Sequence, residues 1–318
     1  MSDVRFRRLG ESGLAVSVVG IGCNNFGRRI DAQRAEEVVR AALDVGVNLF
    51  DTADTYGATP GASEQALGAA LGKRRDEAIV ATKFGNNPRG AHGLDWNARG
   101  GRRYIARAVE DSLRNLGTDY IDLYQIHTPD PATPIEETLA ALDDLVRAGK
   151  VRYLGHSNFA GWQIADAAWT ARSRGLTPFV SAQNEYSLLN RDAEAEVRPA
   201  AQKFGLGLLP YFPLANGLLT GKYRRGAAAP AGTRLAGSDR AQQLADAPWD
   251  RIEAIEAFAA ERGRSVLDVA IGGLAAQPTV ASVIAGATSA EQVRANVAAG
   301  SWEPTAEDLA ELDRRTVA

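Results

Sequence analysis

Short apolar runs and longer amphipathic segments alternate along most of this chain. Residues 47–50 form an apolar run with little polar alternation, which is typical of a strand covered on both faces. In the segment before this run, the apolar positions from 35 to 43 recur at the offsets of one helical face. Asp31 precedes that face as a candidate N-cap, and Gly46 follows it as a terminator. The pattern therefore predicts a helix between Asp31 and Gly46, followed by a buried strand.

The same order of buried strand and amphipathic helix recurs along the chain. Most successive strand starts lie ~25–45 residues apart, the size of a strand-helix unit with its crossover connection. The strand-like runs begin near residues 18, 47, 78, 121, 151, 179, 206 and 281. Units of this kind and number close into a (β/α)8 TIM barrel, so an α/β barrel is the predicted fold.

The two ends of the chain add further elements to the predicted barrel. Residues 4–9 and 14–19 flank a glycine-containing turn and predict an N-terminal β-hairpin. Extra helices are expected late in the chain, near 248–262, 265–276 and 304–315. We expect all these elements to form a single domain over residues 1–318.

An open, doubly wound sheet is the alternative fold. The stretch 20–25 contains Gly20 and Gly22, but it lacks the third glycine of the dinucleotide-binding fingerprint. This sequence therefore argues weakly against the doubly wound alternative.

Local signals predict the start of one helix in particular. Thr133 is expected to act as its cap, with Pro134 in the first turn and Glu136 completing a capping box. A further helix is expected near 191–204, before a long irregular segment that reaches about residue 247.

Composition and charge exclude several classes of function. The formal net charge is −3, and basic and acidic residues are mixed along the chain without an arginine- or lysine-rich block. We therefore expect neither nucleic acid nor a membrane as a partner. The N-terminus lacks the apolar core of a signal peptide, and no apolar run reaches the roughly 18 residues that span a bilayer. The cytoplasm is the expected location.

Cysteine and histidine usage argues against disulfides and metals. Cys23 is the single cysteine, so neither an intrachain disulfide nor a zinc cluster of thiolates is possible. The histidines His92, His127 and His156 do not have the spacing of a metal motif. We expect no catalytic metal.

Polar groups with complementary chemistry follow three consecutive predicted strands. Asp51 and Tyr56 follow the first, Lys83 ends the second, and His127 ends the third. The carboxyl ends of barrel strands meet at one face, where catalytic residues of such folds gather. A merely structural role for each residue is the competing interpretation, and it becomes weaker as the arrangement repeats along the chain.

Together these groups suit the protonation of an oxygen that acquires negative charge. A lysine ammonium beside the phenol of Tyr56 favours its ionised form and so makes it a better proton donor. Asp51 would hold Lys83 charged and oriented, and His127 would hydrogen-bond a substrate carbonyl. None of them supplies a hydride, so a redox cofactor is required.

Residues after the later strands fit such a cofactor. Ser157, Asn158 and Gln183 offer hydroxyl and amide partners for a carboxamide, and Tyr211 offers a flat face for a nicotinamide ring. The loop at 286–289 precedes a predicted helix N-terminus, which is a natural anion site. Lys222 and Arg234 lie in the long segment after the seventh strand and add positive charge there.

Other polar residues are assigned less active roles. We expect His156 to be structural or to lie behind the site, and Cys23 to be a packed small residue. Glu185 and Asp54 are expected to stabilise loops. The loop 84–101, which holds His92, either closes over a substrate or is merely solvated, and both alternatives remain open.

Several of these motifs, in this order and spacing, resemble the aldo-keto reductase superfamily over essentially the whole chain. The similar branch includes bacterial reductases and potassium-channel β-subunits. The motifs that carry the resemblance are Phe50-Asp51-Thr52-Ala53, Tyr56-Gly57, Ala81-Thr82-Lys83, Leu123-Tyr124-Gln125-Ile126-His127, Gly155-His156-Ser157-Asn158, Gln183-Asn184-Glu185-Tyr186, Pro213-Leu214-Ala215, Gly217, Gly221-Lys222-Tyr223, Gly286-Ala287, Glu291-Gln292 and Asn296.

The resemblance implies a nicotinamide-dependent carbonyl reductase in which Tyr56 is the proton donor, Asp51 and Lys83 tune it, and His127 orients the substrate. It implies NADP(H) as the cofactor, with NAD(H) not excluded. The cofactor-binding positions that it implies are Ser157, Asn158, Gln183, Tyr211, Phe212, Pro213, Leu214, Asn216, Lys222, Arg234, Gly286, Thr288, Gln292 and Asn296.

The chain departs from the family pattern at the adenosine end of the implied site. Gly286 and Gln292 stand where many members carry a basic side chain. Ala295 replaces an acidic residue that often meets the adenine.

Three functions are compatible with this sequence. The first is an NADPH-dependent reductase of aldehydes or ketones, and the second is a sugar dehydrogenase that runs the same chemistry in reverse. The third is a nucleotide-binding regulatory subunit, which the retention of His127 and the absence of an N-terminal extension argue against. The substrate is expected to be a small carbonyl compound or sugar, and the sequence leaves the oligomeric state open.

Overall fold

The computed structural model describes residues 4–86, 90, 92–236 and 241–316, and these form a curled parallel sheet surrounded by helices. Strand order is β10-β3-β4-β5-β6-β7-β8-β9, so each strand from β3 to β9 lies beside the next strand in sequence, and the last strand, β10, lies beside β3. The eight strands are β3 (Val19–Gly22), β4 (Leu49–Asp51), β5 (Ile79–Phe84), β6 (Ile121–Ile126), β7 (Val151–Ser157), β8 (Phe179–Gln183), β9 (Gly207–Leu208) and β10 (Val283–Gly286).

Backbone hydrogen bonds close the sheet into a ring between β9 and the segment that leads into β10. The Leu208 N–H donates to the Thr279 carbonyl at 2.8 Å, and the Ala281 N–H donates to the Leu208 carbonyl at 2.9 Å. This closure confirms the predicted (β/α)8 barrel. The open-sheet alternative is excluded because the ring leaves no free sheet edge at this point.

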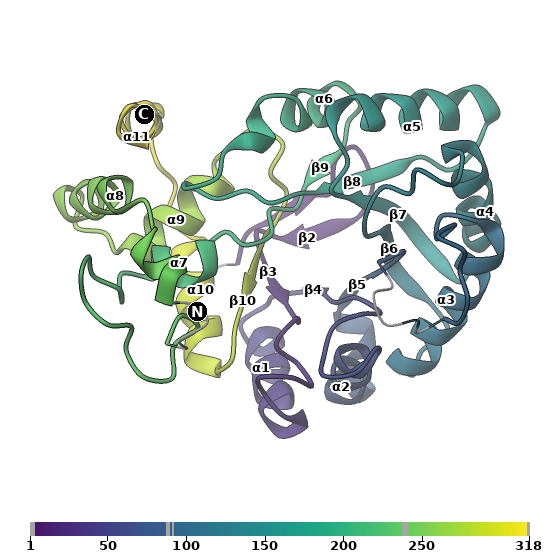
Figure 1. The fold of residues 1–318 in the computed structure, drawn as a ribbon, viewed down its shortest axis with the longest axis horizontal. Helices are drawn as coiled ribbons and strands as arrows, with labels where there is room; N and C mark the ends of the chain where they lie inside the picture. The colour runs from purple at the N-terminus through teal and green to yellow at the C-terminus, as the bar shows by residue number, and fades with distance from the viewer. Residues whose placement is uncertain (1–3, 87–89, 91, 237–240, 317–318) are drawn as a thin grey trace.

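Helices cover the outside of the barrel (Figure 1). Their buried stripes face the strands, as the apolar periodicity predicts. The helices that follow the strands are α1 (Ala32–Asp44), α2 (Ala62–Leu71), α3 (Arg102–Leu116), α4 (Ile135–Arg147), α5 (Gly161–Arg174), α6 (Val197–Lys203) and α10 (Ala290–Ala299). The late additions are α7 (Ala241–Ala245), α8 (Trp249–Glu261), α9 (Val266–Ala275) and α11 (Ala306–Thr316).

The N-terminal hairpin, β1 (Phe6–Arg8) and β2 (Ala15–Ser17), packs against the start of β9. Its turn approaches the barrel so closely that a Cβ at Gly10 would lie 2.3 Å from the Gly205 carbonyl oxygen. Gly10 also has a φ of +60°, which favours glycine. Leu9 and Val16 of the hairpin join the apolar cluster that fills the barrel interior.

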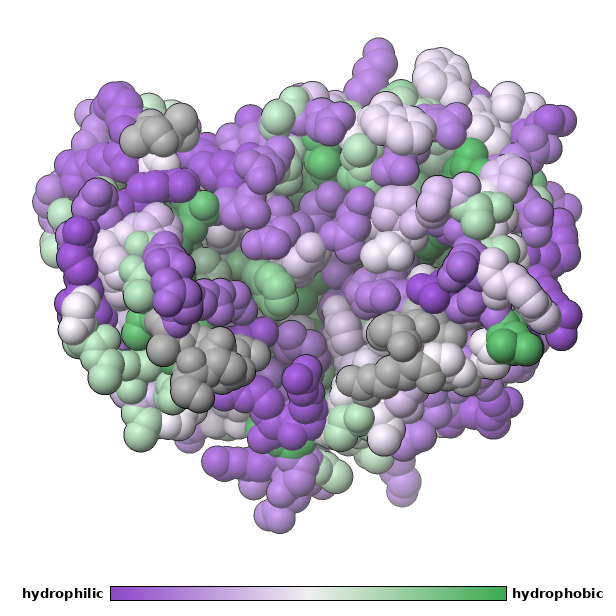
Figure 2. Space-filling model, viewed as in Figure 1, coloured by the Kyte–Doolittle hydropathy of each residue, from purple (hydrophilic) through white to green (hydrophobic). Residues whose placement is uncertain are grey.

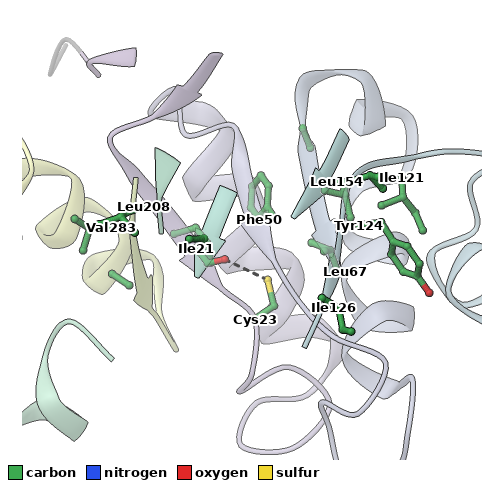
Figure 3. Packing of buried hydrophobic residues seen from close by; sticks show 14 of the residues in the cluster. Ile21, Cys23, Phe50, Leu67, Ile121, Tyr124, Ile126, Leu154, Leu208 and Val283 are labelled. Atoms are coloured by element: carbon green, nitrogen blue, oxygen red, sulfur yellow. Dashed lines mark hydrogen bonds between the residues drawn. The ribbon is translucent and has the colours of Figure 1, made fainter. Parts of the chain in front are cut away.

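A second, larger core lies between the strands and the helices. Figure 3 shows side chains such as Ile21, Phe50 and Tyr124 pointing into this layer. Cys23 belongs to the same layer, where its thiol donates to the Ile21 carbonyl oxygen at 3.7 Å. Its role as a packed residue agrees with the expectation from sequence.

Two local predictions are wrong. Thr133 does not cap α4, because its hydroxyl donates to Asp130 Oδ2 at 2.7 Å and Pro134 occupies the cap position. The helix expected near 191–204 is split into a 3-10 turn, η2 (Asp192–Glu194), and α6. Arg191 pairs with Glu194 within one turn and with Asp313 of α11, which fixes the short turn separately from α6.

Candidate functional site

A cavity of about 710 Å³ opens at the carboxyl ends of the barrel strands. Figure 2 shows this face hollowed near its centre, with hydrophobic surface inside and mainly hydrophilic residues around it. The lining residues are Gly22, Asn24, Asn25, Arg29, Asp51, Tyr56, His127, Ser157, Asn158, Gln183, Tyr211, Phe212, Pro213, Leu214, Asn216, Gly217, Thr220, Lys222, Ala231, Gly232, Thr233, Arg234, Leu267, Ile284, Gly286, Thr288, Gln292, Ala295 and Asn296.

A buried ion pair forms the inner end of the cavity. Lys83 Nζ lies 2.6 Å from Asp51 Oδ2 and donates to the Thr52 carbonyl at 2.9 Å. Gln183 donates its amide to the other oxygen of Asp51 at 2.8 Å. Strand register explains the pairing, since Asp51 aligns with Ala81 of β5 and Lys83 lies two residues further along the same strand, on the same face.

The ion pair keeps the ammonium of Lys83 charged although the side chain is completely buried. Burial alone lowers the pKa of Lys83, but the carboxylate of Asp51 and the hydroxyl of Tyr56 outweigh burial and raise the pKa above its ordinary value. Lys83 is completely buried and lies behind the cavity surface rather than on its rim. The sequence predicted its proximity to Asp51 and Tyr56 but not its depth.

Tyr56 lies between Lys83 and His127. Its hydroxyl is 3.4 Å from Lys83 Nζ, and its ring centroid is 5.7 Å from that of His127 in an edge-on arrangement. The loop that carries Tyr56 turns at Gly57, whose φ of +108° is one that other residues rarely adopt. The four predicted groups are therefore adjacent, although they are far apart in sequence.

The protonation states in this cluster follow mainly from the burial of its groups. Burial raises the pKa of Tyr56, and the opposing effect of the Lys83 charge does not cancel this rise. The sequence led us to expect that Lys83 would favour the ionised phenol; this charge does lower the pKa of Tyr56, but burial raises it by more. Burial, together with the charge of Lys83, lowers the pKa of His127 to about 3, so the imidazole is neutral at physiological pH.

A hydrogen-bond chain joins the next three strands at the same face. Ser157 donates its hydroxyl to the Gln183 carbonyl at 2.7 Å. Asn158 donates to the His127 carbonyl at 2.9 Å and accepts from the Tyr211 hydroxyl at 2.8 Å. Asn158 has a φ of +63°, a conformation that asparagine tolerates better than most residues. These bonds fix the side chains that the sequence predicts to hold a carboxamide.

The opposite wall comes from the irregular segment after β9. Phe212, Ala215 and Asn216 have positive φ values of 53°, 44° and 58°, and the 3-10 turn η3 (Ala215–Thr220) is kinked at Asn216. Arg234 lies over the Phe212 ring, with its guanidinium carbon 5.4 Å from the ring centroid. Lys222 lines the same wall.

The N-terminus of α10 completes the cavity. Ser289 caps the helix by accepting from the Gln292 N–H at 3.4 Å, and Gln292 accepts from the Thr288 N–H at 2.8 Å. Asn296 lines the cavity with an amide nitrogen that is buried and has no hydrogen-bond partner among the described residues. Such a donor fits a bound polar group.

All fourteen predicted cofactor-binding residues line this cavity, as do Asp51, Tyr56 and His127. The lining residues that were not among the predicted site residues are Gly22, Asn24, Asn25, Arg29, Gly217, Thr220, Ala231, Gly232, Thr233, Leu267, Ile284 and Ala295. A signal existed for Arg29, since it follows closely after Asn24 and Asn25 at the end of a strand. No comparable signal marked residues 231–233, which belong to an irregular segment.

The remaining polar residues lie outside the cavity lining. His156 is fully buried and stacks on Phe159 with ring centroids 4.5 Å apart, in agreement with a structural role. His92 is also buried: its ring nitrogens lie 2.9 Å from Asp54 Oδ2 and 2.7 Å from Asp111 Oδ2. The solvated alternative for the loop 84–101 is therefore wrong at His92; residues 87–89 and 91 of that loop lie outside the described residues.

Neither a metal cluster nor a membrane-spanning helix is present in the part of the chain that the structure describes. Within the described residues, no group of three or more histidine, cysteine, aspartate or glutamate side chains could hold a metal ion. Over the same part of the chain, no helix combines the length and apolar character needed to cross a membrane.

The geometry agrees with comparisons to known proteins. The model of the Aldo/keto reductase family matches residues 18–315, so the chain belongs to the aldo/keto reductase family. An uncharacterized oxidoreductase, YrpG of Bacillus subtilis (strain 168), is 37% identical over 302 residues, covering 93% of this chain and 91% of that one.

Two further relatives differ in their described roles. L-glyceraldehyde 3-phosphate reductase of Escherichia coli (strain K12) is 32% identical over 326 residues, covering 98% of this chain and 92% of that one. A probable voltage-gated potassium channel subunit beta of Oryza sativa subsp. japonica is 35% identical over 311 residues, covering 93% of this chain and 91% of that one. The family and its oxidoreductase relatives support oxidoreductase chemistry for this chain.

Proposed function

We propose that this protein is an NADPH-dependent reductase that converts aldehydes or ketones to alcohols, with Tyr56 as the general acid. One observation carries the proposal: the Tyr56 hydroxyl lies 3.4 Å from a buried ammonium, on the wall of a cavity that His127 also lines. We further propose that residues 1–318 act as one domain, because the family match runs from residue 18 to residue 315.

The cavity lining fits a nicotinamide dinucleotide. Amide and hydroxyl groups of Ser157, Asn158 and Gln183 would hold the carboxamide, with the Tyr211 ring beside the nicotinamide. Lys222 and Arg234 would face the pyrophosphate, with Phe212, Pro213, Leu214 and Asn216 on the same wall, and Gly286, Thr288, Gln292 and Asn296 would face the adenosine end. When bound, the cofactor supplies the hydride that no side chain here can provide.

The protein's own groups manage the proton and the charge on the substrate oxygen. Tyr56 is protonated at neutral pH because burial raises its pKa, so it can donate a proton to the oxygen. The neutral imidazole of His127 can hydrogen-bond the carbonyl and fix its direction. Lys83, held by Asp51, places a positive charge behind the phenol and stabilises negative charge as the proton leaves.

The test is Tyr56→Phe, assayed with NADPH and a panel of aldehydes and ketones. Loss of the general acid should lower kcat by about 10²–10⁴-fold while NADPH binding stays within about twofold. Tyr120→Phe, outside the cavity, is the matched control and should retain full activity. Equal turnover by Tyr56→Phe and the wild type would remove Tyr56 from the mechanism.

Two other functions use the same cavity. A sugar dehydrogenase would run the chemistry from alcohol to carbonyl, and screening sugars with NADP and NAD separates it from a reductase. Relatives described as probable channel subunits favour a regulatory role as the second alternative. Tight NADPH binding without turnover on any carbonyl or sugar would support the regulatory role.

A further inference from the structure

The cavity is lined by positive charge on two sides. Lys222 and Arg234 come from the segment after β9, whereas Arg29 comes from the loop between β3 and α1. Asp51 is the one acidic residue in the lining of the described structure, and Lys83 already neutralises it. A ligand with several negative charges would therefore meet cations from two separate segments of the chain.

Backbone hydrogen bonds within the loop hold the position of Arg29. The carbonyl of Asn25 accepts three backbone hydrogen bonds, from the N–H groups of Arg28 at 3.3 Å, Arg29 at 2.9 Å and Ile30 at 3.1 Å. Gly27 adds a bond to the Ile30 carbonyl at 3.1 Å. Asn25 itself is buried. The backbone position of Arg29 is thus fixed without any ligand.

This loop lies against the α10 side of the cavity. Gly22 at the end of β3 pairs in register with Gly286 at the end of β10. A Cβ at Gly286 would lie 3.6 Å from Asn25 Nδ2, so the loop and the α10 entry are in direct contact. Arg29 therefore enters the cavity from the side that α10 forms, whereas Lys222 and Arg234 come from the segment after β9.

The α10 side has no charge of its own at the cavity. The lining residues from β10 and α10 are uncharged: Ile284, Gly286, Thr288, Gln292, Ala295 and Asn296. Arg29 has an exposed side chain that makes no ion pair or side-chain hydrogen bond within the described residues. Among the described lining residues, Arg29 is therefore the cation beside α10.

We propose that Arg29 is a specificity-determining residue that pairs with the 2′-phosphate of the cofactor and so makes the protein prefer NADPH to NADH. The inference rests on the proposed function. The 2′-phosphate is the group that distinguishes the two cofactors, and a guanidinium binds phosphate with two parallel, charge-assisted hydrogen bonds. Arg29 supplies the positive charge that the lining residues of β10 and α10 lack.

The experiment measures dissociation constants of NADPH and NADH by fluorescence titration for the wild type, Arg29→Ala and Arg28→Ala. Arg28 is the matched control, because it is the adjacent exposed arginine and does not line the cavity. Arg29→Ala should weaken NADPH binding about 10–100-fold, the range for hydrogen bonds to a charged group, and change NADH binding less than about twofold. Arg28→Ala should leave both constants unchanged.

Fragment probes and a conservative variant sharpen the result. Competition by 2′,5′-ADP should weaken in Arg29→Ala, whereas competition by 5′-ADP should not. Arg29→Lys should retain part of the NADPH preference, because it keeps the charge but loses the bidentate geometry. Unchanged melting temperatures would show that each variant is folded.

Two results would overturn the inference. Equal weakening of NADPH and NADH would assign Arg29 to the pyrophosphate, and no change in either would remove it from the cofactor site. In both cases the wild type still binds and oxidises NADPH, so the proposed reductase function survives. A wild type that binds neither dinucleotide would instead reject the proposed function, and the role of Arg29 with it.

Discussion

Two walls of the same cavity are built on different principles. The strand wall consists of Asp51, Tyr56, His127, Ser157, Asn158 and Gln183 at the ends of β4 to β8, with Lys83 behind them. The covering segment, residues 212–236, faces it. Strand register and buried hydrogen bonds fix the strand wall. Left-handed backbone turns and exposed ion pairs, such as those of Arg224 with Glu256 and Arg225 with Glu253, fix the covering segment.

The strand wall holds the proposed catalytic groups in fixed positions, whereas the covering segment has to move for a ligand to enter or leave the cavity. A buried ion pair cannot lose one partner without leaving an uncompensated charge in a dry site. Exposed ion pairs contribute little to stability individually and open easily. The proposed proton chemistry therefore lies on the rigid wall, and the proposed cofactor contacts lie partly on the one that can open.

Breaking the buried ion pair should have the largest effect. Lys83→Met leaves Asp51 buried without a cation, so unfolding in urea should show a loss of about 3–5 kcal/mol. Reduction of aldehydes should fall to background, because Tyr56 loses the charge that stabilises it as the proton leaves. Urea unfolding of wild type and Lys83→Met measures the loss of stability, and an NADPH-oxidation assay with aldehydes measures the loss of activity.

A double variant distinguishes the two effects of that change. Lys83→Met combined with Asp51→Asn removes both charges, so it should recover most of the lost stability without recovering turnover. A double variant no more stable than Lys83→Met would show that the lysine stabilises the protein by packing rather than by pairing with Asp51.

Stability should also depend on pH through Glu64, a fully buried residue of α2 that lies outside the strand wall and is hydrogen-bonded to Thr82 of β5. Its carboxylate accepts from Thr82 at 2.7 Å and from Asn115 at 3.0 Å, but burial outweighs these bonds and raises the pKa of Glu64 to about 7. A raised carboxyl pKa stabilises the native state fully below the unfolded value, and this stability is lost as pH rises through 7.

The free energy of unfolding attributable to Glu64 should fall by about 3 kcal/mol between pH 4.5 and pH 8, an order-of-magnitude figure from the shift in pKa. The measurement is the difference between wild type and Glu64→Gln in urea unfolding across that range. Glu36→Gln, on the exposed face of α1, is the control and should run parallel to wild type. A constant difference between wild type and Glu64→Gln would contradict the prediction.

The strand wall is also the part that the sequence predicts best. An apolar run such as residues 47–50 indicates a strand, and the parallel strands of one barrel present the residues after their carboxyl ends at the same face. Asp51, Tyr56 and His127 could therefore be assigned to one site from the sequence. The depth of Lys83 and the buried position of Glu64 could not, because they depend on side-chain packing between α2 and β5 that no periodicity records.

Apart from Lys222 and Arg234, which were assigned to the site from their position and charge, the covering segment was predictable only through family resemblance. Its course depends on positive φ values at Phe212, Ala215 and Asn216, which local propensity does not favour for the first two. Residues 231–233 reach the cavity because the segment folds back, and their composition gives no sign of it. Residues 237–240, part of the long irregular segment expected to reach about residue 247, lie outside the described residues.

Tyr211 provides a smaller test, because its hydroxyl connects the two walls. It donates to Asn158 at 2.8 Å, and the covering segment begins at the next residue. Tyr211→Phe should cost about 0.5–1.5 kcal/mol of unfolding free energy, the usual value of one hydrogen bond. A double-mutant cycle with Asn158→Ala should recover that coupling; additive effects would show that the two walls are independent.

The smallest expected effect concerns the anchor of the covering segment. Arg225 makes two hydrogen bonds of 2.9 Å to Glu253 of α8 and pairs with Asp250, while its side chain stays half exposed. Arg225→Ala should leave the melting temperature almost unchanged, since exposed pairs add little stability. It should speed NADPH release about two- to fivefold, because the segment opens more often when one surface ion pair is lost.

Stopped-flow release of NADPH measures this rate, with Arg40→Ala as the control because Arg40 pairs with Glu36 inside α1, away from the segment. Salt adds a second criterion. Raising the ionic strength should speed release from the wild type and bring it toward the rate of Arg225→Ala, since salt screens exposed pairs more than buried ones. Release that is unaffected by both salt and Arg225→Ala would show that the covering segment is as rigid as the strand wall.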